Sequence, residues 1–138
     1  MNEQIQNELK KIFNSRFSMS ESTRANYARG EDTYDPVLSK AVVFPETNEE
    51  VSKILKLCNE HKIPVVPFGT GTSLEGNVVG NENGITVSLE KMNKVLSVNA
   101  QDFDCRVQAC VTKEQLNEYL REDGVFFPID PGANAAIG

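Results

Sequence analysis

The sequence predicts an α+β fold in which a small parallel βαβ sheet packs beside an antiparallel sheet, with flanking helices. Two observations lead to this fold class. A β-branched run is followed by a helix with its own start signal and then by a second apolar run, which is the order of a βαβ unit. Further along, two segments alternate apolar and polar residues, which is typical of neighbouring antiparallel strands. These segments are residues 41–45, 48–62, 63–68, 94–99 and 105–111.

Two helices are expected before the first strand. Four apolar residues recur at the spacing of one helix stripe: Ile5, Leu9, Ile12 and Phe13. A second, short helix is predicted to begin at Ser20 and to end near Gly30, because glycine is common just after a helix. We therefore divide the chain into an N-terminal helical segment, residues 1–37, and a second part, residues 38–138. The apolar stripe predicts that the first helix packs against this second part.

The βαβ unit has a clear start signal for its helix. Thr47 is followed three residues later by Glu50, which is the pattern of a capping box. The helix after it is predicted to share one apolar face, formed by Val51, Ile54, Leu55 and Cys58. A glycine-rich loop then separates the strand at 63–68 from another strand at 84–89.

The last third of the chain repeats the same signals. Thr112 with Gln115 predicts the start of a further helix, and Gly124 predicts its end. The remaining residues, 125–138, are predicted to begin as a strand and to continue as a proline–glycine loop.

Composition and charge argue against several classes of function. A net charge of −6 and an isoelectric point near 4.8 argue against nucleic acid as a partner, because phosphate backbones are bound by clustered Lys and Arg. No stretch has the roughly 20 apolar residues of a membrane helix, and the N-terminus has the pattern of neither a signal nor a transit peptide. Three cysteines without a CxxC pair indicate reduced, structural thiols, so a cytoplasmic location is expected. His61 is the single histidine, and no metal site is expected.

The loop "PFGTGTSLEGNVVG", residues 67–80, raises the question of what its glycines approach. A dinucleotide fingerprint needs a third glycine where Leu74 stands, and a P-loop needs Lys and a hydroxyl where Asn77 and Val78 stand. From spacing alone, a long structural loop explains the glycines equally well. Hydroxyl residues alternate with the glycines, and the loop has no Lys or Arg, which would suit a diphosphate held by neutral donors. These hydroxyl residues are Thr70, Thr72 and Ser73.

Three stretches in this order resemble the FAD-binding module of the FAD-linked oxidases of the vanillyl-alcohol oxidase type. They are "AVVFPETNEEVSKILKLCNEHKIPVVPFGTGTSLEG", "GITVSLEKMNKVLSVNAQDFDCRVQACVTKEQLNEYL" and "FFPIDPGANAAIG". The resemblance runs from about residue 38 to the end. The motifs "PFGTGTSLEG" and "DPGANAAIG" are most similar to the branch of D-lactate dehydrogenases and glycolate oxidase flavoprotein subunits. It implies that residues 38–138 are the first part of a longer FAD-binding domain, and that the chain is an N-terminal fragment.

The resemblance also implies the cofactor and its contacts. FAD would bind non-covalently, with its diphosphate in the loop and its flavin flanked by the C-terminal segment. The implied cofactor-binding residues are Pro67, Phe68, Gly69, Thr70, Gly71, Thr72, Ser73, Pro131, Gly132, Ala133, Ile137 and Gly138. Substrate-binding and catalytic residues would follow Gly138, so no catalytic residue is assigned in this chain.

The resemblance implies a parent enzyme that oxidises D-lactate, glycolate or a related 2-hydroxy acid, whereas this fragment alone would be inactive. Two alternatives stay open. One is a stand-alone binding or interaction module without redox activity, and the other is an oxidase of the same family that acts on a sugar or a phenol. Apolar surface left uncovered in a fragment would favour self-association.

Overall fold

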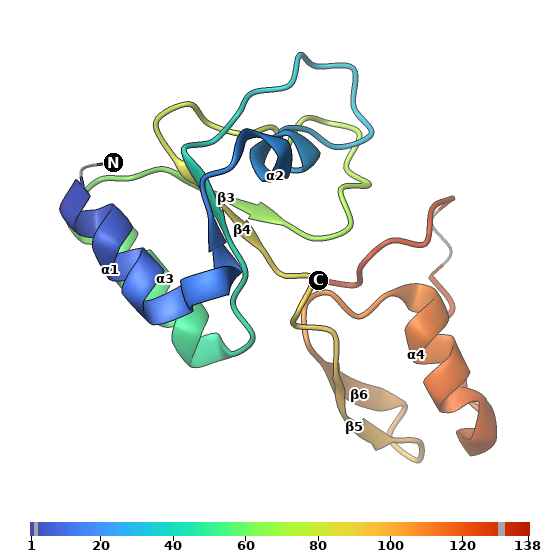
Figure 1. The fold of residues 1–138 in the computed structure, drawn as a ribbon. Coiled ribbons are helices and arrows are strands. Elements are labelled where there is room, and N and C mark those ends of the chain that lie inside the picture. The colour runs from blue at the N-terminus through green and yellow to red at the C-terminus, as the bar shows by residue number, and fades with distance from the viewer. Residues whose placement is uncertain (2, 130–131) are drawn as a thin grey trace.

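The computed structural model describes residues 1, 3–129 and 132–138, and Figure 1 shows its fold. The elements follow one another as α1 (Glu3–Phe13), η1 (Asn14–Arg16), β1 (Phe17–Ser18), α2 (Glu21–Asn26), β2 (Ala41–Val43), α3 (Asn48–Glu60), β3 (Val65–Phe68), β4 (Ile85–Ser88), β5 (Val95–Asn99), β6 (Asp104–Val107), α4 (Lys113–Leu120) and η2 (Arg121–Asp123). The predicted α+β class is confirmed, with one mixed sheet and one antiparallel pair.

The larger sheet has the order β1-β2-β4-β3, in which β2 and β3 are both parallel to β4 and β1 is antiparallel to β2. The strand–helix–strand unit β2–α3–β3 is present, but β4 lies between its two strands. All four residues of β4 are buried, which suits a central strand. Pro67 lies in β3, and proline belongs on an edge because it cannot donate to a ladder.

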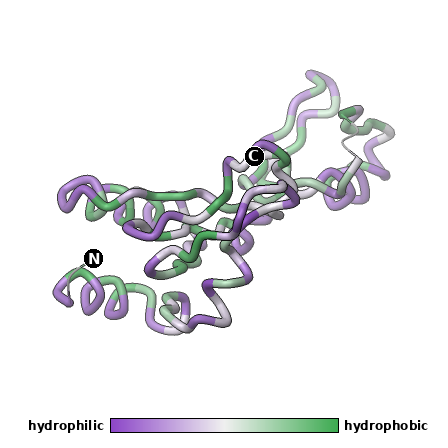
Figure 2. Tube along the Cα trace, turned by 90° about the horizontal axis from the view of Figure 1, so that it is seen from above, coloured by the Kyte–Doolittle hydropathy of each residue, from purple (hydrophilic) through white to green (hydrophobic). Residues whose placement is uncertain are grey.

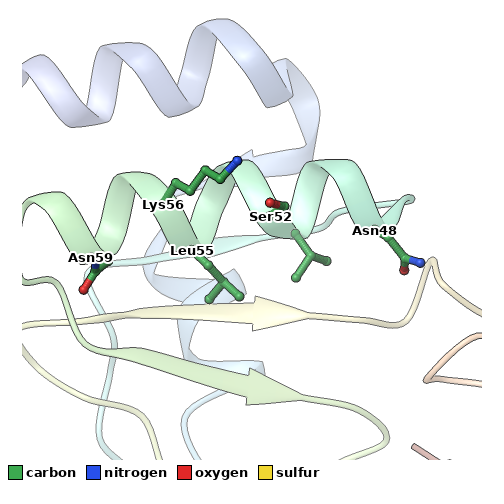
Figure 3. Close-up of a pocket in the computed structure, with 6 residues that line it drawn as sticks. Asn48, Ser52, Leu55, Lys56 and Asn59 are labelled. Atoms are coloured by element: carbon green, nitrogen blue, oxygen red, sulfur yellow. The ribbon is translucent and has the colours of Figure 1, made fainter.

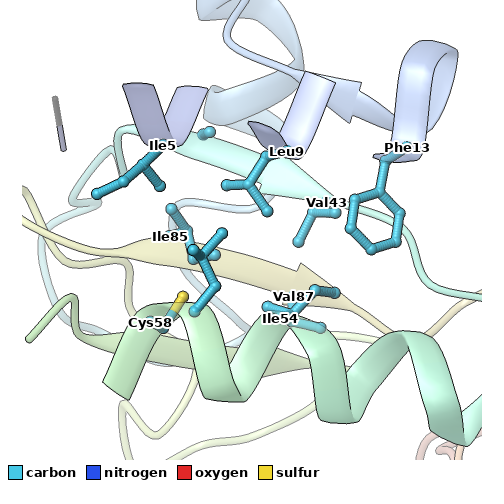
Figure 4. Packing of buried hydrophobic residues seen from close by; sticks show 10 residues of the cluster. Ile5, Leu9, Phe13, Val43, Ile54, Cys58, Ile85 and Val87 are labelled. Atoms are coloured by element: carbon cyan, nitrogen blue, oxygen red, sulfur yellow. The ribbon is translucent and has the colours of Figure 1, made fainter. Parts of the chain in front are cut away.

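α1 and α3 cover the same face of this sheet, as the side chains in Figure 4 show. Ala41 pairs with Ile85 and Val43 with Val87, so these four side chains lie on one face. They form a single core with apolar residues of both helices: Ile5, Leu9, Phe13, Ile54, Leu57 and Cys58. The prediction that the first helix packs against the rest of the chain is therefore confirmed.

Two residues of the predicted helix faces lie outside that core. Ile12 is 41% exposed and Leu55 is 47% exposed, whereas Leu57 takes the buried place on α3. The predicted stripes were too wide because the groove between two helices on one sheet face admits only the central positions of each stripe.

The opposite face of the sheet is covered by α2 and by the irregular segment after it. Ser39 links the layers, because its hydroxyl accepts from the hydroxyl of Thr86 at 2.8 Å and from the amide of Asn81 at 3.1 Å. The Nε atom of Arg24 on α2 donates to the carbonyl of Ser39 at 2.5 Å. The helix was predicted to end near Gly30, but α2 ends at Asn26. Gly30 therefore does not end this helix, and another reason for this glycine is given below.

We call residues 3–89 the sheet lobe, and residues 93–129 with 132–138 the hairpin lobe. The hairpin lobe contains the antiparallel pair β5–β6 and α4, which lie at one end of the elongated molecule in Figure 2. Its core is formed by Val111, Leu116 and Leu120.

The strand predicted at the start of residues 125–138 does not form among the residues that the structure describes there. The side chain of Asn117 on α4 takes its place as the hydrogen-bond partner. It accepts from the amide of Phe127 at 2.7 Å and donates to the carbonyl of the same residue at 3.2 Å. A side-chain amide can satisfy both backbone groups of one residue, so this segment is held without a neighbouring strand.

Candidate functional site

The glycine-rich loop leaves the carboxyl end of β3 and returns to the start of β4 (Figure 1). Ligands in open α/β sheets bind outside the carboxyl ends of parallel strands, which is where this loop begins. Gly71 and Gly76 have φ angles of 75° and 71°, in the left-handed region that glycine adopts without strain. A Cβ atom at Gly71 would also lie 2.8 Å from the ring of Phe68, so this position leaves no room for a side chain.

The loop presents a run of backbone donors. Among the described residues, no N–H group from Gly69 to Gly76 donates a hydrogen bond to a protein acceptor. The hydroxyls of Thr70 and Thr72 form a hydrogen bond with each other at 3.3 Å, which leaves one further hydroxyl hydrogen to donate, and the loop carries no Lys or Arg. Successive free amides in glycine-rich turns form concavities that bind anions. The loop therefore offers neutral hydrogen bonds rather than a counter-charge.

The C-terminal segment lies against this loop. The amide of Ala136 donates to the hydroxyl of Thr70 at 3.2 Å, and a Cβ atom at Gly69 would lie 3.5 Å from the Cβ of Ala136. The segment is held in place from the hairpin lobe, because the amides of Ile137 and Gly138 donate to carbonyls of residues 111 and 109 at 2.9 and 3.0 Å. Two stretches that were separately predicted to bind the cofactor thus meet across 66 positions of sequence.

Other predicted residues of the C-terminal segment are less closely placed. Gly132 is exposed, with nothing within 4 Å of its Cβ position, and the carbonyl of Ala133 accepts from the amide of Ala135. Pro131 was also predicted to contact the cofactor, and it lies outside the described residues.

Tyr27 and Glu90 lie beside the loop and were missed by the sequence analysis. The hydroxyl of Tyr27 donates to Oε2 of Glu90 at 2.5 Å. The Tyr27 ring also packs edge-on against the Phe68 ring, with the two ring centroids 5.0 Å apart. Burial, followed by the bond to Glu90, raises the pKa of Tyr27 to about 12, so the phenol remains protonated at neutral pH. Glu90 lies two residues after the end of the buried strand β4, and this position near a carboxyl end was the signal that could have found it.

A surface hollow of about 510 Å³ is drawn in Figure 3, and it is separate from the loop. All of its lining residues belong to α3, so it follows one helix surface and gathers no polar groups from different elements.

Within the described residues, no three His, Cys, Asp or Glu side chains come together as metal ligands, and no helix is long and apolar enough to span a membrane. The three cysteines are free thiols, of which Cys105 is exposed.

The loop and its neighbours fit a diphosphate. A diphosphate needs hydrogen-bond donors at close range, and the loop offers free amides beside the hydroxyls of Thr70 and Thr72. Its glycines allow a backbone conformation that a side chain would strain. The fold and the site together define a cofactor-binding α+β module.

The chain belongs to the FAD binding domain family, which matches residues 39–138. The cofactor of this family is FAD, and the resemblance to FAD-linked oxidases is confirmed. The chain is 42% identical over 87% of its length to "Probable D-lactate dehydrogenase, mitochondrial" of Danio rerio, of which it covers 24%. It is 47% identical over 70% of its length to "D-lactate dehydrogenase [cytochrome], mitochondrial" of Arabidopsis thaliana, of which it covers 17%. The chain thus spans less than a quarter of these relatives.

A third relative is "Glycolate oxidase subunit GlcD" of Bacillus subtilis, with 33% identity over 67% of this chain and 20% of the relative. Among solved structures, 4-ethylphenol oxidase from Gulosibacter chungangensis has a TM-score of 0.78 and 26% identity, over 95% of this chain and 27% of that one. An alkyldihydroxyacetonephosphate synthase has a TM-score of 0.90 at 22% identity, over 100% of this chain and 29% of that one, and shows the fold alone.

The expectation of a cytoplasmic location is contradicted by the relatives. Four D-lactate dehydrogenases that are 42% to 49% identical to the chain are named as mitochondrial. Net charge and cysteine content describe a folded domain, whereas a compartment is set by address signals that receptors read, so composition could not decide the location.

Proposed function

We propose that the chain is the FAD-binding portion of a flavin-dependent dehydrogenase that oxidises D-lactate, glycolate or a related 2-hydroxy acid to the 2-oxo acid. The names of the relatives from fish, plant and Bacillus support this substrate class. The observation that carries the role of this chain is the run of free amides from Gly69 to Gly76, beside the hydroxyls of Thr70 and Thr72.

In this proposal FAD binds non-covalently, and residues 38–138 form the first part of its domain. The loop from Pro67 to Ser73 holds the diphosphate, and Gly132, Ala133, Ile137 and Gly138 line the flavin side, with Pro131 assigned from the resemblance alone. When bound, FAD supplies the redox chemistry, because it accepts a hydride from the substrate. The protein residues bind and orient the cofactor.

The first test is a titration of the chain with FAD, followed through the amide NMR signals of Gly69, Thr70 and Gly71. FMN, which has one phosphate, and NAD serve as comparison ligands. We expect FAD to shift these three signals, with smaller shifts from FMN. Shifts with NAD alone, or no shift with FAD, would contradict the proposal.

A matched pair of glycine variants sharpens this test. Gly71 and Gly124 have nearly the same φ, 75° and 70°, but the Cβ position of Gly124 has nothing within 4 Å and lies outside the loop. Both Gly71→Ala and Gly124→Ala impose the strain of a left-handed residue. We expect only Gly71→Ala to weaken FAD binding, by roughly tenfold, which is about 1.4 kcal/mol. Equal losses in the two variants would mean that the loop has no special role.

A second candidate substrate class is a phenol, favoured by the structural similarity to 4-ethylphenol oxidase at 26% identity. The two classes are separated by anaerobic mixing of the full-length flavoprotein with D-lactate, glycolate or 4-ethylphenol. We expect the absorbance of oxidised flavin to be lost with a 2-hydroxy acid, and loss with the phenol alone would favour the second class.

A further inference from the structure

Residues 28–37, which we call the brace segment, run beside the glycine-rich loop (Figure 1). The FAD binding domain match begins at residue 39, so the brace segment lies before it. The segment contacts the loop at several places. The amide of Glu31 donates to the carbonyl of Gly71 at 2.9 Å, and the amide of Gly80 donates to the carbonyl of Ala28 at 2.9 Å. In addition, the ring of Tyr34 lies 2.7 Å from the Cβ position of Gly76.

The brace segment has its own fixed shape. Asp32 is buried, with 8% of the residue exposed. Its carboxylate accepts hydrogen bonds from the amides of Gly30 and Tyr34 at 3.1 and 3.0 Å. A carboxylate that bonds amides on both sides of itself holds a tight turn. The contacts to the loop therefore come from a turn that is also held by hydrogen bonds of its own.

Gly30 is the point of closest approach. A Cβ atom there would lie 2.6 Å from the carbonyl oxygen of Gly71, 2.9 Å from that of Ser73 and 2.8 Å from a methyl of Val78. Two backbone oxygens of the loop thus face one backbone position of the brace segment. This close approach explains the glycine, which the sequence analysis had assigned to a helix end.

The orientation of these two carbonyls fixes the neighbouring amides. In a planar trans peptide the C=O and the following N–H point in opposite directions. Because the carbonyls of Gly71 and Ser73 face Gly30, the N–H groups of Thr72 and Leu74 face away from the brace segment. These N–H groups belong to the run that donates to no protein acceptor among the described residues.

We propose that the brace segment is the positioning element of the diphosphate-binding loop. It holds the Gly71 and Ser73 carbonyls behind the loop so that the Thr72 and Leu74 amides are presented together to the diphosphate of FAD. This inference rests on the proposed function, because it assigns a role within the same FAD site. The brace residues touch the loop rather than the cofactor.

The test compares Gly30→Ala with Thr33→Ala, an exposed position of the same segment. FAD affinity is measured at a temperature at which circular dichroism shows every variant to be fully folded. We expect Gly30→Ala to weaken FAD binding by roughly tenfold, because small misplacements of binding groups are costly. In the FAD-free protein, we also expect it to shift the amide NMR signals of Thr72 and Leu74. Thr33→Ala should change neither quantity.

The second variant, Tyr34→Ala, removes only a ring that is 55% exposed and decides the matter if Gly30→Ala fails to fold. We expect it to weaken FAD binding by about threefold. Unchanged FAD affinity in these variants, or an equal loss in Thr33→Ala, would overturn the brace role while the proposed function stands. Absence of FAD binding by the unaltered chain would instead overturn the proposed function, and the FAD-free amide signals would still report on the brace.

Discussion

The sheet lobe and the hairpin lobe differ in how completely their strands are covered. Every residue of β2 and β4 is buried, whereas three of the four residues of β6 are exposed. The sheet lobe has helices on one face and α2 with the brace segment on the other, while the hairpin lobe has α4 and a core of three buried residues. Two-stranded hairpins are marginally stable in water. The glycine-rich loop and the C-terminal segment, which form the proposed FAD site, therefore belong to lobes that we expect to differ in stability.

The largest expected effect comes from removing a matched apolar side chain from each core. Ile85→Ala in the sheet lobe should lower the free energy of unfolding by about 4 kcal/mol, and Leu116→Ala in the hairpin lobe by about 2 kcal/mol, because a less covered core relaxes around the cavity. Ile85 is 0% and Leu116 is 1% exposed, so burial itself is matched.

Urea denaturation together with native-state hydrogen exchange checks this prediction. Ile85→Ala should lower protection in both lobes, and Leu116→Ala in the hairpin lobe alone. Loss of protection throughout the chain in Leu116→Ala would show that the two lobes unfold as one unit.

A smaller effect is expected from the ion pair that fixes the start of α3. Arg16 donates to both carboxylate oxygens of Glu50 at 2.6 and 2.7 Å, and this bond lowers the pKa of Glu50 from 4.5 to about 2. The stabilisation is therefore complete above the unfolded pKa near 4.5 and is lost as pH falls towards 2. Glu50→Gln should cost about 1–2 kcal/mol at neutral pH, since the pair is partly exposed.

The control for this prediction is Glu49→Gln, which removes the same charge from an exposed neighbouring position. Denaturation between pH 7 and pH 2 should show a flatter profile for Glu50→Gln than for Glu49→Gln. Identical profiles would mean that the pair does not stabilise the sheet lobe.

The smallest effect compares the two helix caps. The hydroxyl of Thr47 accepts from the amide of Glu50 at 3.2 Å, and that of Thr112 accepts from the amide of Gln115 at the same distance. Each Thr→Ala change should cost about 1 kcal/mol, and each Thr→Ser change should cost less. Hydrogen exchange should show a global effect for Thr47→Ala and an effect limited to the hairpin lobe for Thr112→Ala. A local effect of Thr47→Ala with a global effect of Thr112→Ala would show that the hairpin lobe is the more stable of the two.

Features that depend on neighbouring residues in sequence were predictable. Both caps, the helix end at Gly124 and the antiparallel pair were correctly expected, because each is decided within a few residues. The glycine-rich loop was found for the same reason, since its composition is a local property. The family resemblance assigned the loop and the C-terminal segment to the same cofactor, but their direct contact was not predicted.

Features that depend on distant partners were not predictable from this sequence. Nothing local shows that the side chain of Asn117 replaces a strand partner of Phe127, or that β4 lies between β2 and β3. Gly30 followed a predicted helix, so a local explanation was available and was wrong. Its actual neighbours are 41 and 43 positions away, at Gly71 and Ser73.

The contact between Thr70 and Ala136 has a consequence for the order in which the chain folds. Closing a chain loop of this size costs about 4 kcal/mol of entropy, whereas one hydrogen bond returns about 1 kcal/mol. Since one hydrogen bond does not offset that cost, we expect the contact to form after the C-terminal residues have been anchored on the hairpin lobe by their bonds to residues 109 and 111. We therefore expect the proposed cofactor site to assemble late in folding, after both lobes have formed.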